Sequence, residues 1–157
     1  MKHMRKLFLP LIAVLLLAAS CTEEGDTYIY DGAYVYVEYP EVKGSYWQYD
    51  EERVAGTNYT TPCLYYEYNN EHINQSMIDN SFVMAYYVDE YSNDVALPYN
   101  FIYTDASGNP HTATISYKVS LGTVKLIVES ADDTYDALQY FLIGMPMNFK
   151  ICMMVND

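Results

Sequence analysis

The sequence predicts an all-β protein, an antiparallel β-sandwich of about seven to eight strands with one short helical turn. The strongest indication is a pair of segments, 114–119 and 124–129, in which apolar and polar residues alternate on either side of Leu121-Gly122. That pattern is typical of a β-hairpin with one apolar face. The chain also contains 19 tyrosines, and tyrosine fits a pleated, half-buried surface. Turn-forming clusters such as DASGNP at 105–110 separate the short apolar segments.

The first half of the domain shows three candidate strands. Residues 34–39 alternate between valine and tyrosine, which predicts a strand. Residues 46–49 form a possible short strand that carries Trp47. The polar segment 50–61 contains Gly56 and Asn58 and reads as a loop. The tyrosine-rich segment 63–68 is the third strand.

A change of pattern follows over residues 70–80. Asn74 is a plausible N-cap for one helical turn over 75–79, and we expect Asn80 to end that turn in a left-handed conformation. The next segment, 81–88, is apolar at successive positions, which predicts a central strand covered on both faces. The acidic segment 89–94 then predicts a turn.

The last third of the chain completes the sandwich. Residues 96–104 predict one strand with Pro98 near its start, where a missing N–H is tolerated. The hairpin comes next. Residues 131–147 are compatible with either a helix or an extra strand. The closing strand, 148–155, places one set of alternating apolar residues on a single face: Phe149, Ile151, Met153 and Val155.

The N-terminus has the pattern of a secretory leader. Basic residues precede an apolar run over 7–19, which is too short to span a bilayer. The run ends in LAASC, which resembles the lipobox of bacterial lipoproteins, where the cysteine is acylated and becomes the first mature residue. We therefore expect a signal peptide over 1–20, lipid attachment at Cys21, an acidic tether over 21–27 and a single domain over 28–157.

Composition and cysteine content exclude several classes of protein. The formal net charge is −13, and three of the eight Lys and Arg residues lie in the leader. A chain without a basic patch is not expected to bind nucleic acid. Apart from Cys21 the domain has Cys63 and Cys152, too few for a disulfide scaffold. Both lie in strand-like segments, and an exported protein permits either two buried thiols or one bridge.

Several segments form a recognisable set: Trp47, CLYYEY, INQSMIDNSFVMAYYV, ALPY, ISYKV, GTVKLIVE and FKICMMV. Together they are similar to a β domain of small Bacteroidetes lipoproteins, which also occurs at the end of collagen-like proteins of those bacteria. The resemblance covers roughly residues 34–155 and implies a β fold and an envelope location, with no established activity. Ser81 stands where the family pattern has glycine.

This resemblance also bears on location. In Bacteroidetes lipoproteins, acidic residues directly after the lipidated cysteine act as a signal for display on the cell surface. Glu23, Glu24 and Asp26 follow Cys21 with Gly25 between them. We therefore expect an outer-membrane protein that is held by its lipid and faces the cell exterior.

The patterns of common catalytic and metal sites are missing. After the leader the sequence has only His72 and His111, with no Cys-x-x-Cys or His-Glu-x-x-His spacing. No Gly-x-Ser-x-Gly elbow or phosphate-binding glycine loop occurs. The acidic runs do not follow the spacing of a calcium loop. We accordingly expect no catalytic residues, no metal and no cofactor.

Aromatic residues are the remaining candidates for a binding surface. If Val35 and Val37 face the core, Tyr34 and Tyr36 face outward, where tyrosine rings can stack on sugars or contact a protein. Trp47 is a further candidate, although a sole tryptophan beside an apolar strand is also a typical core residue. These three residues are the predicted ligand-binding positions.

The sequence therefore predicts a lipid-anchored, surface-exposed binding or structural module whose partner is a glycan or a protein. Two alternatives remain open at this point. One is a glycan-active enzyme with paired carboxylates. The other is a subunit that assembles into a larger surface complex through a sheet edge.

Overall fold

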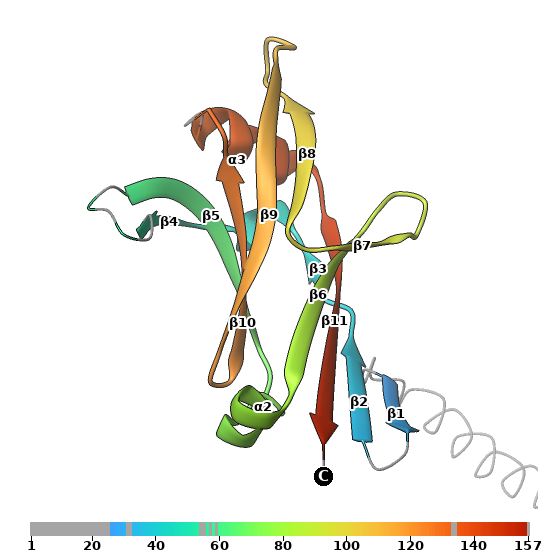
Figure 1. The fold of residues 1–157 in the computed structure, drawn as a ribbon. Coiled ribbons are helices and arrows are strands. Elements are labelled where there is room, and N and C mark those ends of the chain that lie inside the picture. Colours follow the sequence, from blue (N-terminus) through green and yellow to red (C-terminus); the bar gives the residue numbers. More distant parts are fainter. Residues whose placement is uncertain are drawn as a thin grey trace, which may run out of the picture.

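The protein forms two stacked antiparallel sheets with short helices at the ends (Figure 1). In the computed structural model, the last strand of the chain lies in the middle of one sheet. Each sheet contains strands from both halves of the chain. The predicted signal peptide, Cys21 and most of the acidic tether lie outside the described part of the chain. The structure describes residues 26–30, 33–53, 56, 58, 60–132 and 135–156.

The first sheet, sheet A, has the strand order β1-β2-β11-β6-β7, and β3 pairs separately with β11. Its strands are β1 (Asp26–Tyr30), β2 (Ala33–Glu38), β3 (Glu41–Val42), β6 (Phe82–Val88), β7 (Asp94–Ala96) and β11 (Met147–Asn156). The second sheet, sheet B, has the order β4-β5-β10-β9-β8. Its strands are β4 (Gln48–Arg53), β5 (Thr60–Asn69), β8 (Tyr99–Thr104), β9 (Pro110–Ser120) and β10 (Thr123–Ser130).

The all-β sandwich is confirmed, and so is the predicted hairpin. β9 pairs with β10 through a turn at Leu121 and Gly122, where Gly122 has a φ of +75° that favours glycine. The strand count is higher than predicted, with a six-stranded and a five-stranded sheet. Short strands account for part of the difference, because β3 and β7 have two and three residues, too few for an alternation pattern to mark. β1 begins at Asp26, inside the predicted tether.

The core lies between the facing sides of the two sheets. Sheet A contributes Phe149, Ile151 and Met153, each at most 1% exposed, and these are three of the four residues predicted to share one face of the closing strand. Sheet B contributes the inward-facing side chains of the β9–β10 hairpin and of β5, which pairs with β10. Burial of such side chains stabilises by about 1.5–3 kcal/mol each. The sheet B members include Leu64, Ala113, Ile115, Val124, Leu126 and Val128.

The prediction of a loop over 50–61 is wrong. β4 continues through Arg53, and β5 already begins at Thr60. The polar residues of β4 are compatible with a strand because their side chains are paired: Asp50 and Glu52 both accept hydrogen bonds from the Lys125 ammonium. The predicted strand over 46–49 is also shifted, since a 3-10 turn, η1 (Gly44–Tyr46), precedes β4.

The segment 96–104 is two strands and not one. β7 pairs with β6 in sheet A, whereas β8 pairs with β9 in sheet B. The chain crosses between the layers at Leu97-Pro98, where Leu97 is buried and Pro98 has no N–H to continue a ladder. As a result, β7, an edge strand of sheet A, and β8, an edge strand of sheet B, follow one another directly in the chain.

The sequence predicted one of the two α-helices and left the other open. The helical turn is confirmed as α2 (Gln75–Asn80), whose cap Asn74 accepts a hydrogen bond from the Met77 N–H at 3.0 Å. The expected left-handed Asn80 is wrong: among the described residues other than glycine, only Ser92 has a positive φ. The unassigned segment 131–147 contains α3 (Tyr135–Gly144), which buries Leu138 and Leu142. No helix in the described ranges has the length and apolar character needed to span a bilayer.

The prediction that 81–88 is covered on both faces is wrong as well. β6 pairs Val83 and Ala85 with the core residues of β11, so this side of the strand faces inward. On the other side, Phe82 is 48% exposed and Met84 is 38% exposed. A run of apolar residues marks a doubly covered strand only if a third layer exists, and here the outward side chains face solvent.

Candidate binding site

A cleft of about 340 Å³ opens where the β6–β7 turn, strand β8 and the segment between α3 and β11 meet. Its volume lies in the range of small-ligand sites. Aromatic and methionine side chains make most of the wall, and two carboxylates lie on the turn. We call it the tyrosine cleft; its lining residues are Tyr87, Asp89, Glu90, Tyr91, Tyr99, Phe101, Ile102, Met145 and Met147.

The floor of the tyrosine cleft is continuous with the core. The rings of Tyr87 and Tyr99 stack with centroids 6.1 Å apart and an interplanar angle of 12°. Tyr87 also meets Phe149 edge to face, with centroids 6.2 Å apart. Because Phe149 is fully buried, it fixes the position of the Tyr87 ring, and Tyr87 fixes that of Tyr99. The aromatic wall is therefore preorganised.

The acidic rim is held by a tight hydrogen-bonded turn. One Asp89 oxygen accepts the N–H groups of Tyr91 at 2.9 Å and Asn93 at 2.8 Å, and the other accepts the Asn93 side-chain amide at 2.9 Å. These bonds, first of all those from Asn93, lower the pKa of Asp89, so it is ionised at neutral pH. Ser92 supplies the positive φ of 63° that closes the turn. The turn presents Glu90 and Tyr91 to solvent.

The electrostatics of the tyrosine cleft favour a cation or a neutral group. Burial, followed by the negative charge of Asp89, the Tyr99 hydroxyl and Glu90, raises the pKa of Tyr87. Its phenol is therefore neutral at physiological pH. The described lining contains carboxylates but no lysine, arginine or histidine.

The described lining of the tyrosine cleft lacks several side-chain types that are common in catalysis. It has no serine, cysteine or histidine to act as a nucleophile or a base. A glycosidase pair needs one carboxyl group whose pKa is raised so that it can donate a proton. Asp89 has the opposite shift, and its oxygens are occupied by the turn. The described lining thus offers aromatic faces and ionised or neutral oxygen atoms for contact with a ligand.

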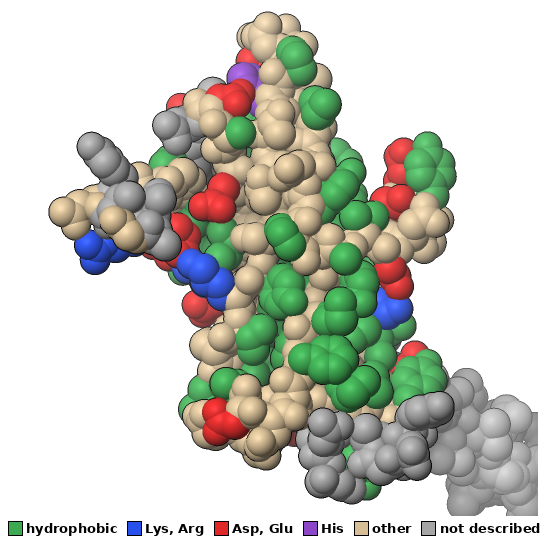
Figure 2. All heavy atoms as spheres, in the orientation of Figure 1, with side chains coloured by type: hydrophobic (Ala, Val, Ile, Leu, Met, Phe, Trp, Pro, Cys, Tyr) green, Lys and Arg blue, Asp and Glu red, His purple; other side chains and the backbone are tan. Residues whose placement is uncertain are grey.

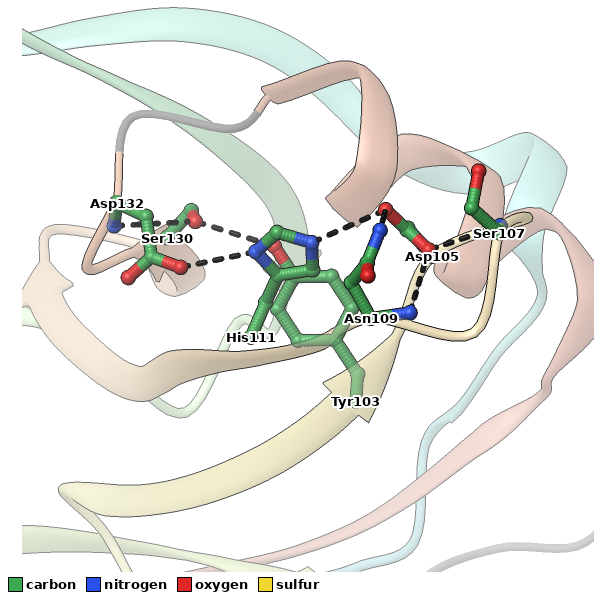
Figure 3. A network of polar contacts seen from close by, with 7 residues as sticks. All are labelled: Tyr103, Asp105, Ser107, Asn109, His111, Ser130 and Asp132. Carbon is green, nitrogen blue, oxygen red and sulfur yellow. Dashed lines mark hydrogen bonds and ion pairs between the residues drawn. The ribbon is translucent and has the colours of Figure 1, made fainter.

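A second polar cluster lies at the end of sheet B (Figure 3). His111 Nδ1 is 2.9 Å from Asp132 and Nε2 is 3.3 Å from Asp105, so each ring nitrogen faces a carboxylate. Hydrogen bonds with Asp132 and then Asp105 raise the pKa of His111. The ring stacks on Tyr103, whose hydroxyl is 3.1 Å from Ser130 Oγ.

This arrangement ties two segments of the chain together. An imidazole with a carboxylate at both nitrogens is favoured as the doubly protonated cation. The His111 network thus links the β8–β9 turn, through Asp105, to the segment after β10, through Asp132. Among the residues that the structure describes, no group of three or more His, Cys, Asp or Glu is placed to hold a metal ion.

The expected outward orientation of Tyr34 and Tyr36 is wrong. The β2–β11 register pairs Tyr36 with Met153, a fully buried core residue, so Tyr34 and Tyr36 lie on the core side of sheet A. Val35 lies on the outer side. Tyr36 stacks on His72 with centroids 4.1 Å apart and packs against the core. Alternation identified the two faces of β2, but the inward face is set by pairing with β11.

Trp47 is a core residue rather than a surface residue. It is 9% exposed and meets Phe149 edge to face with centroids 6.3 Å apart. Its buried Nε1 has no hydrogen-bond partner among the described residues. A smaller cavity of about 190 Å³ lies beside it, between η1 and α3.

Of the two alternatives for the cysteines, the structure has free thiols. Cys63 precedes the core residue Leu64 in β5 and therefore lies on the outer side of sheet B, where it is nevertheless fully buried. Cys152 lies between Ile151 and Met153 and so faces the outer side of sheet A, half-buried. The two sulfurs are on opposite sides of the sandwich.

The lining of the tyrosine cleft was missed by sequence reasoning for a physical reason. Its residues come from three separate segments, 87–91, 99–102 and 145–147. Only the fold brings these segments together. The partial signals were the acidic turn, which was predicted, and the two tyrosines at 86 and 87 that precede it.

Comparison with known proteins found no relative of this chain. No protein-family model matches the chain, and neither a curated protein nor a solved structure matches it. The functional reasoning below therefore depends on the geometry of the chain itself and on the patterns in its sequence.

Proposed function

We propose that this protein is a lipid-anchored protein of the bacterial outer membrane, displayed toward the cell exterior, that binds a partner and catalyses no reaction. The leader pattern and the LAASC sequence before residue 22 support the anchor. The resemblance to small Bacteroidetes lipoproteins supports the location.

The observation that carries the binding role is the tyrosine cleft. Four aromatic rings and two carboxylates surround one concave site without a basic residue among the described lining. Such a site suits the ammonium or guanidinium group of a basic partner protein. A cation over an aromatic ring gains about 0.5–1 kcal/mol when exposed and about 2 kcal/mol when desolvated. The net charge of −13 also attracts a basic partner.

The cleft is tested with an arginine peptide and matched variants. We expect the purified protein to bind acetyl-tetraarginine amide in a calorimetric titration, with affinity that falls as salt rises. Tyr91→Ala removes one exposed ring of the cleft, and Glu90→Gln removes one charge without changing shape. Each is expected to weaken binding by several-fold. Tyr140→Ala is the control, because Tyr140 is also exposed, at 61% against 78% for Tyr91, but lies on α3, outside the lining.

Three outcomes would count against this assignment. If the peptide binds as well to the Tyr91→Ala and Glu90→Gln variants as to the native protein, the cleft is not the site. If a neutral glycan binds and the peptide does not, the ligand class is wrong. If incubation with a glycan or a peptide releases a hydrolysis product, the non-enzymatic role is wrong.

The anchor is tested separately. Cys21→Ser is expected to move the protein from the membrane fraction to the soluble fraction and to remove a lipid mass from the N-terminal peptide. Two acyl chains hold a protein stably on a bilayer, since each buried CH₂ contributes about 0.8 kcal/mol. Unchanged membrane retention and an unmodified N-terminal peptide would contradict lipidation.

A further inference from the structure

The outer side of sheet A is an unusually apolar surface for an acidic protein. The registers of β1, β2, β6 and β11 place one alternate set of side chains on this side. Three of them, Tyr28, Phe82 and Met84, are 56%, 48% and 38% exposed. Figure 2 shows hydrophobic side chains gathered over β6 and β11. We call this surface the apolar face; its main members are Tyr28, Val35, Phe82, Met84, Tyr86 and Met154.

Charged groups lie at the margins of the apolar face. Lys150 donates to Asp94 at 2.6 Å, and its ammonium is 5.9 Å from the centroid of the Tyr86 ring. Asp26 lies at the other margin, on β1. A contiguous exposed apolar surface rimmed by polar groups marks a contact surface.

The position of this face relative to the predicted anchor indicates what it contacts. Only four residues separate Cys21 from Asp26, the first residue of β1. A chain spans at most about 3.6 Å per residue, so β1 begins within about 18 Å of a lipid-modified Cys21. Tyr28, in the same strand, is a member of the apolar face. The face therefore begins where the tether delivers the domain to the bilayer.

We propose that the apolar face rests on the headgroup region of the membrane that holds the lipid anchor, an inference that depends on the proposed lipidation. Tyrosine rings with an apolar body and a polar tip suit that region, as do phenylalanine and methionine side chains. The Lys150 ammonium lies where it can meet a lipid phosphate. A second copy of the chain is a poorer occupant, because two copies that each carry a net charge of −13 repel one another.

This contact leaves the tyrosine cleft available. Tyr87 and Met84 lie on opposite sides of β6, since Tyr87 faces the buried Phe149 and Met84 faces outward. A domain that lies on its apolar face thus keeps the cleft on the side of the sheet that points away from the lipid. Membrane contact and partner binding are compatible in one orientation.

The test measures the depth of a fluorescent label in the lipidated protein. The label is placed at Met84→Cys, or at Phe82→Cys as a second position, in a chain that also carries Cys152→Ser. The matched control is Thr112→Cys, an exposed position next to the buried Ala113 and therefore on the outer side of sheet B. Cys63 is fully buried, so we expect it to take up label far more slowly than an exposed cysteine. The vesicles are phosphatidylcholine with brominated acyl chains.

We expect bromine to quench the label at position 84 and at position 82 several-fold more than the label at position 112. Equal quenching at the three positions in a lipidated chain would overturn membrane contact while leaving the anchor intact. Labels at 82 and 84 that are shielded from aqueous iodide but not quenched by bromine would show that a second copy covers the face, which also overturns it. A chain that carries no lipid and stays off the vesicles would refute the anchor and this inference together.

Discussion

The outer sides of the two sheets have the same backbone geometry and opposite chemistry. On sheet B, the Lys125 ammonium donates to Asp50 at 2.7 Å and to Glu52 at 3.1 Å, and it lies 4.3 Å from the centroid of the Tyr65 ring. Lys118 adds a further bond to Glu52. On sheet A, the corresponding surface exposes Tyr28, Phe82 and Met84.

The two sheets therefore differ in the side chains that cover their outer sides. Both sheets turn one alternate set of side chains into a common core, so the core does not distinguish them. On its outer side, sheet B pairs Lys118 and Lys125 with the carboxylates of β4. Sheet A leaves apolar area uncovered, which is the expected property of a surface that meets another apolar phase. The predictions below test this contrast.

The largest expected effect comes from the shared core. Leu126→Ala, on the inner side of β10, is expected to lower the free energy of unfolding by about 2–5 kcal/mol, because it leaves a cavity among fully buried neighbours. Met84→Ala, on the apolar face, is expected to change it by less than about 1 kcal/mol, since its side chain already faces solvent. Urea denaturation of the two variants measures both values. Similar losses would mean that the outer side of sheet A is packed in solution.

The second effect concerns the charged side of sheet B. Lys125→Met removes the ammonium shared by Asp50 and Glu52 and is expected to cost roughly 1 kcal/mol at neutral pH, a value that shrinks in high salt. The bond from Lys125 lowers the pKa of Asp50, and bonds from Lys118 and then Lys125 lower the pKa of Glu52 against the opposing effect of burial.

The sign of the pH dependence follows from those directions. A carboxyl group with a lowered pKa in the folded state stabilises above its unfolded pKa, near 4. That contribution disappears as pH falls through the folded pKa. The difference between the native protein and Lys125→Met should therefore be full at pH 7 and shrink below about pH 4. A difference in urea midpoint that does not depend on acid or salt would mean that Lys125 acts through packing alone.

The sequence predicted most of the fold because local pattern and local structure agree there. The hairpin over β9 and β10, the capped turn at Asn74 and the acidic turn at 89–94 are each decided by residues close together in the chain. The loop prediction for 50–61 failed because Asp50 and Glu52 find their partner, Lys125, on β10, 75 and 73 residues away.

The candidate site was less predictable for the same reason. Alternation in β2 showed that Tyr34 and Tyr36 share a side, but only the pairing of Tyr36 with Met153 shows that this side is the core. The tyrosine cleft depends on the crossing at Leu97-Pro98, which moves the chain from one sheet to the other. No local pattern distinguishes that crossing from a continuous strand.

The third prediction uses the charged end of sheet B. The pKa of His111 is raised by Asp132 and then Asp105, so its charged form is favoured in the folded state. The stabilisation is complete below the unfolded pKa of about 6.5 and is lost as pH rises through the higher folded value. We expect the melting temperature to decline from pH 6 upward through that range, and His111→Asn to remove this decline. His72→Asn is the control, since the His72 ring stacks on Tyr36 and forms no ion pair with a carboxylate among the described residues. An unchanged pH profile in His111→Asn would exclude the network as its source.

The smallest effect concerns the alkylation rates of two cysteines, one on the outer side of each sheet, and involves no change in stability. Cys63 is fully buried on sheet B, and burial, with Glu52 and Asp50 next in importance, raises its pKa to about 11. Cys152 is half-buried on sheet A, where burial also raises its pKa. Alkylation depends on thiolate and on access. We therefore expect iodoacetamide at pH 8 to modify Cys152 slowly and Cys63 at least ten-fold more slowly, with the two rates converging in urea.

The same measurement then connects the thiols to the membrane. Vesicles of phosphatidylcholine that carry the lipidated protein are expected to slow the modification of Cys152, which belongs to the outer side of sheet A, and to leave that of Cys63 unchanged. Peptide mass mapping assigns each modified cysteine. Faster modification of Cys63 than of Cys152 in the folded protein would contradict the placement of the two side chains. Equal slowing of both by vesicles would indicate a general change in opening rather than contact at one face, because a thiol reached only through opening reports local unfolding.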